Sequence, residues 1–155
     1  FNVGFDFNHE SAATKYFVDR VNRYWLDEFK FDGFRFDLSK GFTQFNSGGN
    51  VELWGQYDQS RINLLKRMAD SIWVAHPDAY IILEHFAENS EETVLSDFGM
   101  MLWGNMNYEY NEATMGYQSN LSGATHLSRG WNDKHLVAYM ESHDEERASY
   151  KIKTY

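Results

Sequence analysis

Cysteine is absent from the 155-residue sequence, and proline occurs only once. Without cysteine the chain has no disulfide, thiolate nucleophile or cysteine-ligated metal site. The same absence is compatible with the cytosol, the periplasm or secretion, and we favour an extracellular or periplasmic location slightly over a cytoplasmic one. No stretch approaches the roughly 18 consecutive apolar residues of a membrane span.

Basic residues are also scarce, with 14 Lys and Arg against 23 Asp and Glu and a formal net charge of −9. Proteins that bind nucleic acids usually carry a basic surface that neutralises phosphates. An anionic membrane surface is disfavoured for the same reason. The charge balance therefore predicts no nucleic acid and no membrane as partner, and it favours an uncharged substrate.

Aromatic residues, by contrast, are abundant, with 12 Phe, 10 Tyr and 5 Trp. The hydrophobic fraction of 43% is ordinary for a soluble folded chain, so part of the aromatic set packs a core. A surplus also suits a sugar-binding cleft, because the C–H faces of a pyranose stack on flat rings. Composition alone leaves both explanations open.

Hydrophobic periodicity predicts helices that alternate with short strands. Helices are expected at about residues 12–29, with Ser11 as the N-cap, and at 58–75. We expect strands at 31–38, 80–85, 100–103 and 136–140, a long loop at 41–55, and a helical or irregular segment at 108–127. This order indicates an α/β fold with a parallel sheet, and charged residues cluster where its strands end.

The predicted strand at 31–38 alternates between two faces. Gly33, Arg35 and Asp37 share one face, and the phenylalanines, which should pack under helices, share the other. Arg35 and Asp37 are neighbours on one face, so we expect them to pair. Such an ion pair either belongs to a functional site or only fixes the packing, and these residues alone do not decide.

A second candidate, Glu84, follows an apolar run. Partial burial there would raise the pKa of its carboxyl towards that of a general acid. The alternative is a glutamate at the start of a solvated loop, which is how we interpret Glu88, Glu91 and Glu92.

His143 and Asp144 close the last predicted strand. A His-Asp pair in this position can clamp a substrate, ligate a metal or cap a loop. The residues beyond it, Glu145, Glu146 and Arg147, are expected to lie mostly at the surface.

In combination these segments resemble the α-amylase family of glycoside hydrolases and transglycosylases. Residues 33–37 (GFRFD) are similar to the Gly-x-Arg-x-Asp motif on barrel strand four of that family. Glu84 corresponds to the Glu on strand five, and residues 141–144 (ESHD) to the His-Asp motif on strand seven. The opening residues 1–8 look like the family's approach to the helix before strand four, so the resemblance covers nearly the whole chain.

The resemblance implies a retaining glycoside hydrolase that cleaves α-glucosidic bonds in starch, glycogen or maltooligosaccharides. Asp37 would be the nucleophile, Glu84 the acid/base, and Asp144 the carboxylate that holds sugar hydroxyls. This chemistry requires no cofactor. Calcium is common in the family and a structural calcium is possible in the full-length protein, but no residue here matches its ligands.

Three further residues receive roles from the resemblance. Arg35 would orient and ionise Asp37, His143 would hydrogen-bond the sugar beside Asp144, and Lys40 would lie at the acceptor side. Gly41 departs from the pattern, because the family often has a His after this Lys.

The family's first motif, an Asp…Asn-His run at strand three, is absent. Asn8 and His9 do not supply it, because they lie too close to residues 33–37 and lead directly into a helix. We therefore expect residues 1–155 to form a partial (β/α)8 TIM barrel, with strands four to seven and without the early strands and the last strand. Such a segment is expected to be inactive alone and to self-associate through its open sheet edges.

Other functions stay open at this point. A transglycosylating or branching enzyme of the same family uses the same three carboxylates. A non-catalytic glycan-binding relative is disfavoured because all three are present. A flavodoxin-like domain is disfavoured because no Gly-rich phosphate loop follows any predicted strand.

Overall fold

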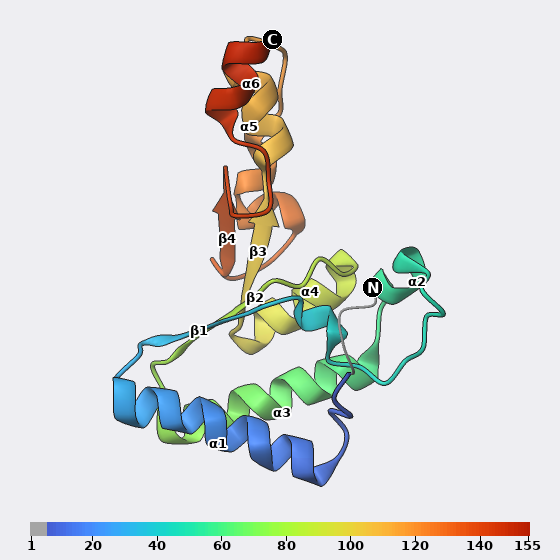
Figure 1. Ribbon diagram of the computed structural model, residues 1–155, viewed down its shortest axis with the longest axis vertical. Helices are drawn as coiled ribbons and strands as arrows, with labels where there is room; N and C mark the ends of the chain where they lie inside the picture. Colours follow the sequence, from blue (N-terminus) through green and yellow to red (C-terminus); the bar gives the residue numbers. More distant parts are fainter. Residues whose placement is uncertain (1–5) are drawn as a thin grey trace.

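Four short parallel strands form one sheet within residues 6–155, the part of the chain that the computed structural model describes. The strands are β1 (Gly33–Phe36), β2 (Tyr80–Leu83), β3 (Met101–Asn105) and β4 (Leu136–Tyr139), and they lie side by side in chain order (Figure 1). All three pairings are parallel. The predicted α/β class with a parallel sheet is confirmed, and the arrangement is consistent with part of a TIM barrel.

Helical segments connect each strand to the next, as parallel pairing requires. The α-helices are α1 (Ala12–Phe29), α2 (Val51–Gly55), α3 (Gln59–Ala75), α4 (Asn89–Phe98), α5 (Asn107–Thr114) and α6 (Ala148–Thr154), and the 3₁₀ helices are η1 (Ser39–Gly41), η2 (Leu121–Ala124) and η3 (His126–Arg129). In Figure 1, α1 and α3 lie side by side at the lower end, and α5 and α6 pack together at the upper end.

The hydrophobic core lies between one face of the sheet and the helices. Leu83 and Leu102 are fully buried on this face, where they join Leu65 of α3 and Leu95 of α4 in one cluster. Because side chains alternate along a strand, the intervening residues share the opposite face. That face carries Arg35, Ile82, Trp103 and Tyr139, which are only partly buried.

Helix α3 begins at an N-cap that the sequence supplies. The Asp58 side chain accepts hydrogen bonds from the backbone N–H of Ser60 at 2.8 Å and of Arg61 at 3.2 Å, which satisfies two donors of the first turn. One face of α3 is then buried along its length by Ile62, Leu65, Met68, Ala69 and Ile72. The predicted helix at 58–75 is confirmed to within one residue.

Several local predictions need correction. Helix α1 runs as expected over residues 12–29, but the Ser11 side chain makes no cap hydrogen bond. Instead the Asn8 side chain accepts from the Ser11 N–H at 3.2 Å. The loop at 41–55 ends in the short helix α2, and residues 108–127 hold the rest of α5 and two 3₁₀ turns. Residues 1–5 of the opening stretch lie outside the described residues.

The expectation of a solvated loop around Glu91 and Glu92 is wrong. Both belong to α4 and are 0% and 2% exposed, whereas Glu88 at the N-cap position is exposed. Burial of these carboxylates is possible because each has a cationic partner, Arg61 for Glu91 and Arg129 for Glu92. A sequence window around 88–92 contains neither partner, so the acidic run looked like a solvent-facing one.

Candidate active site

Asp37 and Glu84 lie at neighbouring strand ends. Phe36 pairs with Leu83 in the register of β1 and β2, and the Glu84 N–H donates to the Phe36 carbonyl at 3.0 Å. The two acids therefore sit together at the carboxyl edge of the sheet, where parallel α/β folds place their sites. The Asp37 side chain is 76% exposed, and that of Glu84 is 10% exposed.

The guanidinium of Arg35 joins the two carboxyl groups. One of its terminal nitrogens donates to Asp37 Oδ1 at 2.5 Å, and the other donates to Glu84 Oε2. The Arg35 Cζ atom lies 4.0 Å from the centre of the Trp103 ring, a cation–π contact that fixes the plane of the guanidinium. The expected pairing of Arg35 with Asp37 is confirmed, and Arg35 reaches Glu84 as well.

Burial raises the pKa of the Glu84 carboxyl, as the sequence predicted. Arg35 opposes this shift through its positive charge, and the nearby negative charge of Asp37 adds to it. A glutamate with a raised pKa keeps its proton at higher pH and can donate it to a leaving group. Asp37 is instead an exposed carboxylate with a charge-assisted hydrogen bond. The two acids thus have unlike surroundings although one cation serves both.

Asp144 lies on the segment that follows β4. His143 Nε2 is 3.5 Å from Asp144 Oδ2, and both side chains are 65% exposed. The segment is shaped by Glu145, which accepts hydrogen bonds from the Ser142 N–H at 3.0 Å and from the Tyr139 hydroxyl at 3.1 Å. Within the described residues, Asp144 has no contact with Arg35, the cation that joins Asp37 and Glu84. Glu145, expected mostly at the surface, therefore organises this segment.

Tyr139 connects the two parts of the site. The pKa of its phenol is raised by burial, by its bond to Glu145, and by the negative charges of Glu84 and Asp144. Its ring lies 4.7 Å from that of Trp103. An aromatic surface thus runs from Arg35 across the open face of the sheet. Sequence reasoning did not single out either ring, although Trp103 alternates with the buried Leu102 and Gly104 in a predicted strand.

Lys40 belongs to η1, at the start of the loop that follows β1, and it is 8% exposed. Its ammonium lies 3.4 Å from the Phe86 carbonyl oxygen and 4.6 Å from the centre of the Trp54 ring. Burial lowers the pKa of Lys40. On the outer side of the same loop an open groove extends from Asp37, lined further by Leu38, Gly41, Gln44, Phe45, Asn46, Asn50 and Trp54. Amides and aromatic rings of this kind suit sugar hydroxyls and C–H faces.

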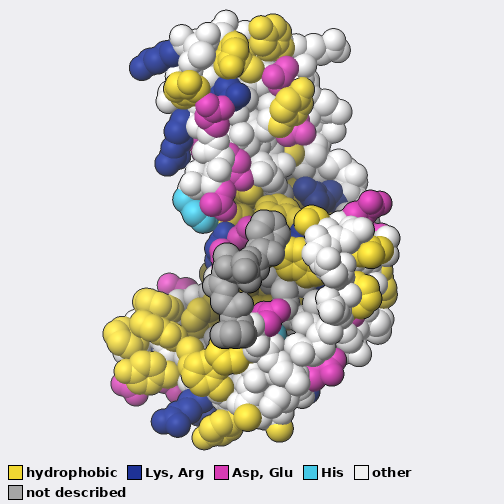
Figure 2. All heavy atoms as spheres, turned by 45° about the vertical axis from the view of Figure 1, so that its right-hand side comes forward, with side chains coloured by type: hydrophobic (Ala, Val, Ile, Leu, Met, Phe, Trp, Pro, Cys, Tyr) yellow, Lys and Arg dark blue, Asp and Glu magenta, His cyan; other side chains and the backbone are white. Residues whose placement is uncertain are grey.

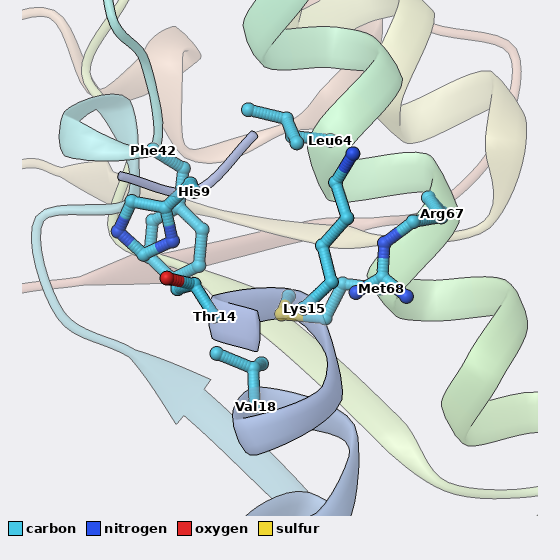
Figure 3. Close-up of a pocket in the computed structure, with 8 residues that line it drawn as sticks. All are labelled: His9, Thr14, Lys15, Val18, Phe42, Leu64, Arg67 and Met68. Atoms are coloured by element: carbon cyan, nitrogen blue, oxygen red, sulfur yellow. The ribbon is translucent and has the colours of Figure 1, made fainter. Parts of the chain in front are cut away.

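A small cavity between α1 and α3 has no place in this chemistry. Figure 3 shows His9 and Phe42 on one side of it and Lys15 and Arg67 on the other. The His9 ring stacks on Phe42 with centroids 4.2 Å apart, and burial lowers the pKa of His9. His9 thus packs on Phe42, and it also lines the groove that extends from Asp37.

Sequence reasoning missed a group of buried polar residues behind the two acids: Ser39, Arg61, His85 and Glu91. The acidic run at 88–92 could have signalled the start of α4, because acidic residues are favoured in the first turn of a helix. No local pattern predicts that Glu91 pairs with Arg61, which lies 30 positions earlier in the chain.

The chain is 28% identical over 163 aligned residues to the 1,4-alpha-glucan-branching enzyme 2-2 of Arabidopsis thaliana. The alignment covers 90% of this chain but only 19% of the relative. No family model matches the sequence. The similarity supports a link to the glycoside hydrolases and transglycosylases as a broad group.

Within residues 6–155, no helix has the length and hydropathy to cross a membrane. No three His, Asp or Glu side chains in that part of the chain converge in a way that could hold a metal ion.

Proposed function

We propose that this chain carries the catalytic residues of a retaining enzyme that hydrolyses α-glucosidic bonds in starch, glycogen or maltooligosaccharides. The observation that carries the proposal is the bridge from Arg35 to both Asp37 and Glu84. Two carboxyl groups on one guanidinium favour the narrow spacing of a retaining pair, about 5 to 5.5 Å, over the roughly 6.5 to 9.5 Å that leaves room for water in an inverting one.

In the proposed mechanism, Asp37 attacks the anomeric carbon as the glycosidic bond breaks. Glu84 gives its proton to the departing oxygen, so a glucosyl ester on Asp37 and a free sugar hydroxyl result. Glu84 then takes a proton from water, whose oxygen attacks the anomeric carbon and releases Asp37. The raised pKa of Glu84 and the exposure of Asp37 support this division of roles.

Asp144 and His143 are proposed to hold sugar hydroxyls once substrate is bound. Their high exposure leaves both side chains accessible to a ligand. Lys40 is proposed to lie on the acceptor side and to support residues 41–55, which we call the groove loop. Its ammonium is turned towards the Phe86 carbonyl and the Trp54 ring.

A second candidate, transglycosylation or branching, is favoured by the similarity to a branching enzyme. The same carboxylates would serve, but a sugar hydroxyl instead of water would take the glucosyl group from Asp37. The groove beside Asp37 offers room for such an acceptor. New branch points, counted by NMR against released reducing ends, distinguish the two outcomes.

We also propose that the four strands belong to a larger barrel, which needs about 250 residues and eight strands to close. An exposed aromatic cluster supports this. Tyr24, Trp25, Phe29 and Phe31 are 38% to 53% exposed, and the Trp25 and Phe31 rings stack with centroids 5.4 Å apart. Figure 2 shows hydrophobic side chains gathered at the lower left of the molecule, the end at which Figure 1 places α1. Further elements of a barrel, or a second copy of the chain, would cover such a surface.

The test compares the full-length polypeptide that contains these residues with its Asp37→Asn variant on soluble starch. We expect the wild type to release products that first appear as the α-anomer in early-time NMR spectra. Asp37→Asn should abolish turnover and keep glucan binding, because the amide cannot form the ester. Initial β-anomer, or near-normal turnover by the variant, would overturn the proposal.

A further inference from the structure

A row of four buried polar side chains lies behind the ends of β1 and β2. Ser39 Oγ is 2.9 Å from His85 Nδ1, and His85 Nε2 is 2.8 Å from Glu91 Oε1. Arg61 closes the row with two hydrogen bonds of 2.7 Å to the Glu91 carboxylate. All four residues are 0% or 1% exposed, so water does not weaken these interactions.

One end of the row holds the backbone of Glu84. The Ser39 N–H donates to the Glu84 carbonyl at 2.7 Å, and Ser39 Oγ lies 3.0 Å from the same oxygen. Ser39 stands two residues after Asp37, and His85 directly follows Glu84. The row therefore ties together the two segments that carry the proposed nucleophile and acid.

The other end of the row holds the groove loop. The Arg61 guanidinium donates to the carbonyls of Lys40 at 3.2 Å, Trp54 at 3.1 Å and Gln56 at 2.9 Å. One cation thus fixes both Glu91 and the start and end of the loop. The charges of Arg61 and Glu91 balance each other, so the buried row carries no net charge when His85 is neutral.

The positions of the protons follow from burial, which lowers the pKa of His85 and favours the neutral ring. The single ring proton must then lie on Nε2, because the Glu91 carboxylate can only accept. Nδ1 is left as an acceptor, and the single proton of the Ser39 hydroxyl is shared between it at 2.9 Å and the Glu84 carbonyl at 3.0 Å. Ser39 is thereby held by its N–H to Glu84 and by its O–H to His85.

We propose that Ser39 and His85 are positioning residues for Glu84, and that the Arg61–Glu91 ion pair anchors them. The inference rests on the proposed function, since it assigns Glu84 a proton to deliver. A buried ion pair is poor evidence of stabilisation, because well-packed apolar residues often serve as well. The contacts of Ser39 with the Glu84 carbonyl instead fix the backbone position from which the Glu84 side chain extends.

The experiment uses the full-length polypeptide and the variants Ser39→Ala and His85→Gln. The glutamine can keep a donor near Nε2 for Glu91, but it loses the acceptor at Nδ1. A displacement of about 1 Å at a reacting group costs up to about a hundredfold in rate. We expect each variant to lower kcat ten- to hundredfold with KM within about twofold. The alkaline limb of activity should move to lower pH, because a less confined Glu84 is better hydrated.

The matched control is Ser96→Ala. Ser96 is also 0% exposed, but its hydroxyl has no hydrogen-bond partner among the described residues. It should leave kcat and the pH profile unchanged. The double variant Ser39→Ala/His85→Gln should lose much less than the product of the two single losses, because both changes break one contact.

The outcomes separate the two levels of the argument. An inactive wild type would contradict the proposed function itself. An active wild type whose Ser39→Ala and His85→Gln variants match Ser96→Ala would refute the positioning role. So would variants that lose thermal stability and activity but keep the wild-type pH profile, since that pattern marks a purely structural contact. If Ser39→Ala fails to fold, His85→Gln alone decides by the same criteria.

Discussion

The ends of β1 and β2 and the segment after β4 hold their carboxylates in different ways. Glu84 is 10% exposed, shares Arg35 with Asp37, and is backed by buried side chains. Asp144 is 65% exposed, and its ion-pair partner is His143 at 3.5 Å. The first arrangement is fixed from inside the protein, whereas the second is held at its surface.

The difference matches the demands of the proposed chemistry. A proton donor needs fixed surroundings, because desolvation and nearby charges set its protonation. The nucleophile must be held in place, and Arg35 does this for Asp37 through a hydrogen bond of 2.5 Å. A carboxylate that binds sugar hydroxyls must exchange water for ligand, and an exposed position allows this. We therefore expect substitutions at the first two strand ends to act on chemistry or folding, and substitutions after β4 to act on binding.

After the loss of turnover in Asp37→Asn, the largest effect should come from Glu84→Gln, which removes the proton donor. Substrates with poor leaving groups should lose about 10² to 10⁴ in rate, the usual contribution of a general acid. Activated aryl glycosides need little protonation and should lose far less. Steady-state kinetics of both substrate types in the full-length enzyme, with exposed Glu88→Gln as the control, measure the ratio. Equal losses would remove Glu84 from the role of acid.

Glu91→Gln should have the largest effect on folding. The amide leaves the Arg61 guanidinium, which is 1% exposed, without its counter-charge. Breaking a buried pair in this way costs about 3 to 5 kcal/mol. Urea denaturation of the chain should show this loss, or no folded state at all, while Glu88→Gln stays within about 0.5 kcal/mol of wild type. Equal stability of the two variants would contradict the comparison between fixed and exposed positions.

Glu92 should make the free energy of unfolding depend on pH. Burial raises its pKa from 4.5 to about 7 despite its contact with Arg129. The folded state therefore binds more protons than the unfolded state between about pH 4.5 and 7, and the free energy of unfolding falls as pH rises through this window, by up to about 3 kcal/mol. Urea denaturation at several pH values should show this slope in the wild type and lose it in Glu92→Gln. A slope that persists in the variant would assign it to another group.

The smallest effect on stability should be that of Asp144→Asn. Its side chain is exposed and its contact with His143 is a surface one, so the free energy of unfolding should change by less than about 0.5 kcal/mol. Binding of maltooligosaccharides to the full-length enzyme should weaken, as calorimetry can measure. A clear loss of stability with unchanged binding would mean that the segment after β4 is structural.

The sequence predicted those parts of the fold that depend on local patterns. Helices at 12–29 and 58–75 follow from periodicity, and the four strands from short apolar runs. The Arg35–Asp37 pair and the raised pKa of Glu84 follow from strand alternation and burial.

What could not be predicted depends on contacts between distant segments. The burial of Glu91 requires Arg61, which lies 30 positions earlier, and only the packing of α3 against α4 brings the two together. The same holds for Tyr139, whose position near Glu84 requires strands β2 to β4 to be aligned. No window of sequence contains these partners.

The most direct test of the account is to identify the residue that becomes glycosylated. Incubation of the active full-length enzyme with a fluorinated α-glucosyl donor, which forms the ester quickly and hydrolyses slowly, should add one glucosyl mass per chain. Peptide mass spectrometry should place that mass on Asp37, and Asp37→Asn should remain unlabelled. Labelling of another residue, or turnover without any labelled intermediate, would contradict the assignment of Asp37 and Glu84 as the catalytic pair.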